Sequence, residues 1–124
     1  MTQEDYVSFN VAKLLKEKGY NEPCKQFYCK AYDDTWNCDN DCLRFRLVTY
    51  SELEDGDILI PSLYDAQKWL REKHGIIVDI DTDYYDGFLF TYQAWSFDKV
   101  SEKQSFDTYE EALNEGIKEA LKMI

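Results

Sequence analysis

Residues 76–95, IIVDIDTDYYDGFLFTYQAW, decide the fold. Apolar and polar residues alternate on both sides of Asp86-Gly87, and an Asp-Gly pair is typical of a hairpin turn. A two-residue loop at Asp86-Gly87 would place Asp79 on the same face as Phe88 and would mix charges with aromatic rings. A three-residue loop over residues 85–87 keeps the two kinds apart, so we predict an antiparallel hairpin with that loop. The apolar face is expected to hold Val78, Ile80, Tyr84, Phe88, Phe90 and Tyr92. The solvated face is expected to hold Asp79, Asp81, Asp83, Thr91 and Gln93, with Trp95 at its far end.

Three helices are predicted around this hairpin from capping residues and apolar spacing. Residues 8–18 form the first, with Ser8 as N-cap and Gly19 as the left-handed stop. The second runs from an N-cap at Ser62 to Gly75, and the third starts at Asp107 or Thr108 and runs to the end of the sequence. The expected buried stripe of the second helix is Leu63, Ala66, Trp69 and Leu70. That of the third is Tyr109, Ala112, Leu113, Ile117, Ala120, Leu121 and Ile124. Every glycine is expected at a helix stop or a turn.

Two further strands are predicted over residues 25–32 and 43–50, joined by the polar, turn-rich linker DDTWNCDNDC of residues 33–42. We expect them to pair antiparallel, with Phe27, Cys29 and Ala31 meeting Leu43, Phe45 and Leu47. The predicted order is α-β-β-α-β-β-α. The expected fold class is α+β, a mainly antiparallel four-stranded sheet with three helices on one face, as a single domain over residues 1–124.

The chain is acidic, with 25 Asp and Glu against 14 Lys and Arg and a net charge of -11. A field of this sign repels phosphate, which argues against direct non-specific binding of nucleic acid. The acidity also has a simple interpretation as solubility in a crowded cytosol. The sequence has no long apolar run and no basic, apolar leader, so we expect a cytoplasmic protein without membrane association.

All four cysteines lie close together in the sequence as Cys24, Cys29, Cys38 and Cys42, a C-x4-C-x8-C-x3-C pattern. Four thiolates can bind a structural zinc ion, although zinc knuckles normally use C-x2-C pairs. Cys24 and Cys29 are an odd number of residues apart and would face opposite sides of a regular strand. The alternatives are isolated reduced thiols, which fit a cytoplasmic protein with no bound cofactor, and a disulfide or redox pair.

The acids at Asp79, Asp81 and Asp83 have the alternating spacing of a calcium loop, but Tyr84 stands where such a loop needs Gly and the closing Glu is absent. A solvated strand face that discourages edge aggregation is the simpler interpretation. His74 is the single histidine, at a predicted helix C-terminus, and no catalytic or phosphate-binding motif is present. The sequence therefore indicates no catalytic residue.

The sequence contains more aromatic residues than one small core readily buries, with ten Tyr, seven Phe and three Trp. The surplus can pack over helix and sheet edges with its polar tips in water, or it can form a surface for a partner, including a second copy in a homodimer. The candidate partner-binding residues are Trp36, Tyr85 and Trp95 with Asp79, Asp81 and Asp83.

Three segments, VSFNVAKLLKEKGY (7–20), PSLYDAQKWLREKHGI (61–76) and SFDTYEEALNEGIKEALKMI (105–124), are similar to recurring blocks of a known group. Together they resemble short uncharacterised proteins encoded by bacteriophages and prophages of gut anaerobes. The resemblance covers the three predicted helices and implies a setting, an accessory protein made in a bacterial host cell. It implies no activity, since none is known for the group.

The leading hypothesis is a non-enzymatic binding module for a host or phage protein or for a small ligand. One form of it is mimicry of nucleic-acid charge at a basic site. The first alternative is a domain stabilised by zinc through the four cysteines. The second is a small carboxylate-dependent enzyme that processes nucleotides.

Overall fold

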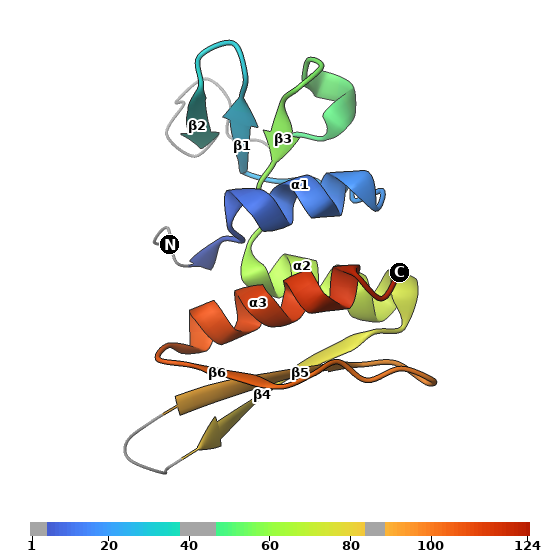
Figure 1. Ribbon diagram of the computed structural model, residues 1–124. Coiled ribbons are helices and arrows are strands. Elements are labelled where there is room, and N and C mark those ends of the chain that lie inside the picture. The colour runs from blue at the N-terminus through green and yellow to red at the C-terminus, as the bar shows by residue number, and fades with distance from the viewer. Residues whose placement is uncertain (1–4, 38–46, 84–88) are drawn as a thin grey trace. The chain divides into compact units, whose positions relative to one another are not determined.

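The computed structural model describes residues 5–37, 47–83 and 89–124 (Figure 1). The fold is α+β, with three helices and two three-stranded antiparallel sheets among these residues. The chain divides into two compact units, an N-terminal unit of Ser8–Pro61 and a C-terminal unit of Met1–Val7 with Ser62–Ile124. The predicted single four-stranded sheet is therefore wrong, and the predicted single domain stays a prediction. No helix among the described residues is both long and apolar enough to cross a membrane.

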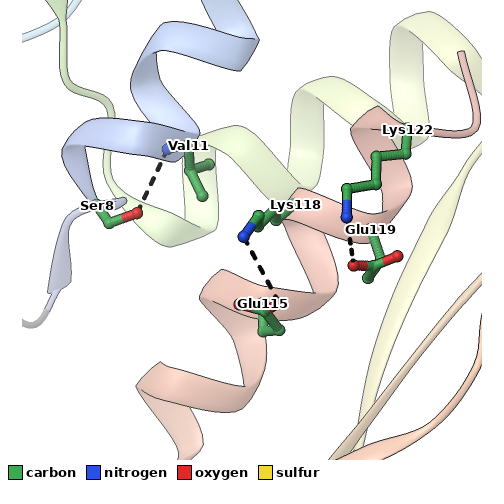
Figure 2. Close-up of polar contacts among 6 residues, drawn as sticks. All are labelled: Ser8, Val11, Glu115, Lys118, Glu119 and Lys122. Carbon is green, nitrogen blue, oxygen red and sulfur yellow. Dashed lines mark hydrogen bonds and ion pairs between the residues drawn. The ribbon is translucent and has the colours of Figure 1, made fainter.

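The N-terminal unit begins with α1 (Phe9–Glu17), which starts and stops where the sequence predicts. The Ser8 hydroxyl accepts a hydrogen bond from the Val11 N–H at 3.4 Å (Figure 2), and Gly19 follows the helix with a φ of 94°. The sheet has the order β2-β1-β3, with β1 at Gln26–Cys29, β2 at Asp34–Asn37 and β3 at Ile58–Leu59, and a short 3-10 helix η3 spans Tyr50–Glu52. The buried apolar residues of this unit include Val11, Leu15, Tyr20, Val48 and Leu59.

The predicted pairing of residues 25–32 with residues 43–50 is wrong. Phe27 pairs with Trp36 on one side and Leu59 on the other, so both edges of β1 are occupied. The segment predicted as a turn-rich linker contains β2, because Asp33 takes a left-handed φ of 48° and turns the chain back onto β1. Leu43 and Phe45 lie outside the described residues, and Leu47 is exposed.

The C-terminal unit contains α2 (Leu63–His74), β4 (Ile77–Asp83), β5 (Leu89–Trp95), β6 (Gln104–Phe106) and α3 (Tyr109–Leu121). Its two helices begin at the predicted caps. Ser62 accepts from the Asp65 N–H at 3.1 Å, and Thr108 accepts from the Glu111 N–H at 3.1 Å. The predicted stripe of α2 is confirmed, since Leu63, Ala66, Trp69 and Leu70 are all buried.

The register of the β4–β5 hairpin is the one that the three-residue loop predicts. Ile80 lies opposite Tyr92, and Asp83 lies opposite Leu89. The midpoint of each pair is residue 86, which is the middle residue of the predicted loop over residues 85–87. Residues 84–88 lie outside the described residues. The third strand, β6, was not predicted, because three residues are too short to show a strand period.

Helices α2 and α3 both lie on one face of this sheet (Figure 1). The helix α3 buries Ala112, Leu113, Ile117, Ala120 and Leu121, as its spacing predicts, and it also buries Gly116. The prediction that Tyr109 and Ile124 belong to the buried stripe is wrong, because Tyr109 is the first residue of α3, Ile124 lies beyond its end, and they are 45% and 41% exposed. The solvent side of α3 carries the ion pairs of Lys118 with Glu115 and of Lys122 with Glu119 (Figure 2).

Gly116 contradicts the expectation that every glycine marks a stop or a turn, because it lies inside α3. A Cβ at this position would come within 2.7 Å of Val78 Cγ1 and 3.0 Å of Tyr92 Cβ. The absence of a side chain therefore lets α3 approach the sheet closely.

Candidate functional site

The sheet of the C-terminal unit has one face that its helices do not cover, and this face is the candidate site. Side chains alternate between the two faces of a strand, and those of Val78, Tyr92 and Ala94 are buried on the helix side. The opposite side chains form what we call the open face. Its described side chains are Ile77, Asp79 and Asp81 of β4, Leu89, Thr91, Gln93 and Trp95 of β5, and Ser105 of β6.

Trp95 is fixed across the open face by a hydrogen bond. Its indole Nε1–H donates to Asp79 Oδ2 at 2.8 Å. The strand register places Trp95 opposite Ile77, so this bond runs diagonally between β5 and β4. Trp95 is 40% exposed, which leaves an accessible aromatic side chain beside an exposed carboxylate.

A row of oxygen atoms crosses the three strands next to this pair. Asp81 lies opposite Thr91, which in turn lies opposite Ser105. The Thr91 and Ser105 hydroxyl oxygens are 3.0 Å apart and share a hydrogen bond. Since residues on one face recur about every 6.6 Å along a strand, the Asp81, Asp79 and Trp95 rows together span about 13 Å. This is enough for several residues of an extended chain.

The open face is negatively charged at its β4 side. Between Lys73 and Lys99 the sequence contains no Lys or Arg, so neither β4 nor β5 carries a cation. Lys99 lies on the connection to β6, and its Nζ donates to the Met123 carbonyl at 3.3 Å. Lys103 immediately precedes β6, at the opposite edge of the sheet from β4. The two described carboxylates of the face are thus separated from both lysines by β5 in the sheet order.

The structure brings together three of the residues predicted to bind a partner, Asp79, Asp81 and Trp95. Asp83 ends β4 opposite Leu89, and only its backbone is described. Trp36 belongs to β2 of the N-terminal unit, where again only the backbone is described. Tyr85 lies outside the described residues. Sequence reasoning missed Ser105, because nothing in a three-residue strand signals which face its middle residue takes.

The two described cysteines have different surroundings. Cys24 is 4% exposed, its backbone bridges to Val48, and its thiol donates to the Glu22 carbonyl at 3.4 Å. Cys29 is half-buried on β1, opposite Asp34. Cys38 and Cys42 lie outside the described residues. Within the described ranges no three His, Cys, Asp or Glu side chains gather as metal ligands, and the four-cysteine zinc site stays a prediction.

One carboxylate of the acidic loop SELEDGD, residues 51–57, is structural. Asp57 is 6% exposed, and its two carboxylate oxygens accept from the Lys30 N–H at 3.0 Å and the Glu54 N–H at 3.1 Å. The side chain therefore ties the loop to the end of β1. Nearby, the Tyr50 hydroxyl accepts from the Leu59 N–H at 3.0 Å, and burial raises the pKa of Tyr50 to about 12.

A cleft of about 350 Å³ lies elsewhere in the C-terminal unit, between the end of α2, the β5–β6 connection and the end of α3. Its lining includes His74, Phe97, Asp98 and Lys99. The Lys99 ammonium is already bound to the Met123 carbonyl, and the Asp98 carboxylate accepts from the Ser96 hydroxyl at 3.3 Å. Both polar groups are thus engaged within the protein, so the cleft does not present a set of converging groups for a ligand.

No family model, curated protein or solved structure matches this chain.

Proposed function

We propose that the protein is a non-enzymatic binding module whose open face receives a basic segment of another protein. The single observation that carries this proposal is the exposed Asp79–Trp95 pair beside Asp81, on strands that hold no cation. The carboxylates would pair with Lys or Arg side chains, and the ring of Trp95 offers a surface on which their aliphatic stems and charged groups can rest.

The chemistry of the face favours a protein partner over the other classes considered. Phosphate groups of nucleic acids would be repelled by Asp79 and Asp81. Small ligands are usually held in concave sites, whereas the open face is one side of a sheet. A basic, extended protein segment has the opposite charge to Asp79 and Asp81, and it can run along the length of about 13 Å that the three rows of side chains cover. An exposed aromatic next to charged groups is also typical of residues that dominate protein interfaces.

The partner proposed is a host or phage protein in the cytoplasm of a bacterial cell. This part of the proposal depends on the resemblance of the three helices to phage and prophage proteins. The open face supplies only the chemical class of the partner, a segment rich in Lys or Arg.

The proposal is tested with a fluorescent oligolysine peptide of seven residues, the length of β4. We expect Asp79→Asn/Asp81→Asn to weaken binding about tenfold or more at low salt, with a further loss as salt rises. The matched control is Glu52→Gln/Glu54→Gln, which removes the same charge from two exposed residues of the N-terminal unit. It should change the affinity by less than about twofold.

Equal losses in the two double variants would contradict the proposal, because the peptide would then respond to net charge alone. An oligoglutamate peptide of equal length serves as the negative control. If it binds as well as oligolysine, charge complementarity at the open face is refuted.

A further inference from the structure

The backbone of β5 shows which way the backbone groups of β4 point. The Ala94 N–H donates to the Ser101 hydroxyl at 2.9 Å, and the Ser101 N–H donates to the Ala94 carbonyl at 2.7 Å. In a strand the N–H and C=O of one residue point to the same side. Both groups of Ala94 therefore point toward the β6 side of the sheet and away from β4.

It follows that Val78, which lies opposite Ala94, directs its N–H and C=O away from β5 toward the free edge. A side chain confirms this, since Gln67 Nε2 donates to the Val78 carbonyl at 2.7 Å. The side to which the backbone N–H and C=O groups point alternates from one residue to the next along a strand. The N–H and C=O groups of Ile80 and Thr82 therefore point to the free edge, as those of Val78 do. Among the described residues, neither has a hydrogen-bond partner outside the sheet.

We propose that this edge of β4 binds an extended basic segment by strand addition, so that the segment becomes a fourth strand beside β4. The inference rests on the proposed function and specifies how the partner binds. The N–H and C=O groups of Ile80 and Thr82 supply the main-chain hydrogen bonds. Thr82 is exposed and Ile80 half-buried, so the edge is accessible along this stretch.

The residues beside the edge select the occupant. An added strand places alternate side chains next to Asp79 and Asp81 on the open face, where Lys or Arg are complementary. Its other side chains fall next to Ile80, which favours apolar residues. A second copy of β4 at the same edge would bring acids against acids, which is unfavourable. The fitting occupant is therefore an extended segment of another protein that alternates basic and apolar residues.

The direct test uses a capped seven-residue peptide that alternates Lys and Val, with amide hydrogen exchange as the readout. In the free protein the Ile80 and Thr82 amides should exchange quickly, and those of Asp79 and Asp81, which point toward β5, slowly. At saturating peptide we expect the Ile80 and Thr82 amides to exchange at least about tenfold more slowly. Unchanged exchange at both residues with bound peptide would overturn the inference.

A backbone variant gives a second, independent test. Thr82→Pro removes one N–H that points away from β5, a position where edge strands tolerate proline. We expect the Lys-Val peptide to bind at least about tenfold more weakly to Thr82→Pro and within about twofold of wild type to Thr82→Ala, which keeps the N–H. If Thr82→Pro fails to fold, the exchange measurement on the wild-type protein decides the question.

The failure of this inference can be told apart from failure of the proposed function. If Asp79→Asn/Asp81→Asn abolishes peptide binding and Thr82→Pro does not, the peptide lies on the open face without adding a strand, and the inference is overturned alone. If neither variant weakens binding, both are overturned. A wild-type dimer in sedimentation that Thr82→Pro converts to a monomer would also overturn the inference, because the edge would then hold a second copy.

Discussion

Replacing Gly116 with Ala should destabilise the C-terminal unit, although the same change at an exposed helix position stabilises. An ordinary Gly→Ala substitution inside a helix gains about 1 kcal/mol from helix propensity. At Gly116 the new Cβ would lie 2.7 Å from Val78 Cγ1 and 3.0 Å from Tyr92 Cβ. These neighbours cannot move easily, since Val78 is 1% exposed and Tyr92 is 2% exposed.

The net effect follows from the two opposing terms. Overpacking of a dense core typically costs about 1–3 kcal/mol, and contacts this short to a β-branched side chain and to a Cβ belong at the upper end of that range. Subtracting the gain in helix propensity leaves a loss of about 1–2 kcal/mol in the free energy of unfolding. The measurement is urea unfolding followed by far-ultraviolet circular dichroism.

A double variant identifies the atom responsible. Val78→Ala removes the Cγ1 methyl that the new Cβ would meet, so Gly116→Ala should cost about 1 kcal/mol less in the Val78→Ala background than in the wild type. A Gly116→Ala protein that is more stable than wild type would refute the close approach of α3 to the sheet. Strict additivity in the double variant would refute the role of Val78.

Three further predictions concern the N-terminal unit. Asp57→Ala should lower the free energy of unfolding by about 3 kcal/mol in urea titrations, because two backbone N–H groups lose their acceptors, and Asp57→Asn should cost less; equal losses would argue against the paired hydrogen bonds. The raised pKa of Tyr50 means that its unfolded form ionises first between pH 10 and 12, so stability should fall over that window more steeply in wild type than in Tyr50→Phe, and parallel curves would contradict this. In a variant that keeps Cys24 as its single cysteine, the buried thiol should react with Ellman's reagent only at the rate of unfolding, and faster reaction would contradict its burial. In the wild-type protein with all four cysteines, thiols that react only after a chelator is added would support the zinc site.

The helices could be predicted because their signals are local. Ser62 and Thr108 cap the helices that follow them through their own hydroxyls, and the apolar spacing inside each helix needs no knowledge of its partner. The register of the β4–β5 hairpin could also be predicted, since of the two loop lengths compared only the three-residue loop separates Asp79 and Asp81 from Phe90 and Tyr92. The same alternation placed Asp79 and Asp81 beside Trp95.

The predicted strand over residues 25–32 contains β1, whereas β2, β3 and β6 could not be predicted, because their stability comes from partners elsewhere in the sequence. The two residues of β3 and the three of β6 are too short to show a period, and polar β2 is a strand because its backbone pairs with β1. Gly116 gave no local signal either, since its role depends on Val78 from the sheet. The grouping of Trp36 with Trp95 came from composition, which carries no information on the unit to which each belongs.

The central claim is that the open face binds a basic segment, and the Trp95 indole N–H reports on it directly. A two-dimensional NMR titration with the oligolysine peptide should shift this resonance together with the backbone amides of Asp79 and Asp81, because the indole donates to the Asp79 carboxylate. We expect these shifts to be lost in Asp79→Asn/Asp81→Asn. A peptide that binds with its shifts centred on the acidic loop of residues 51–57, and with the Trp95 indole unmoved, would contradict the account.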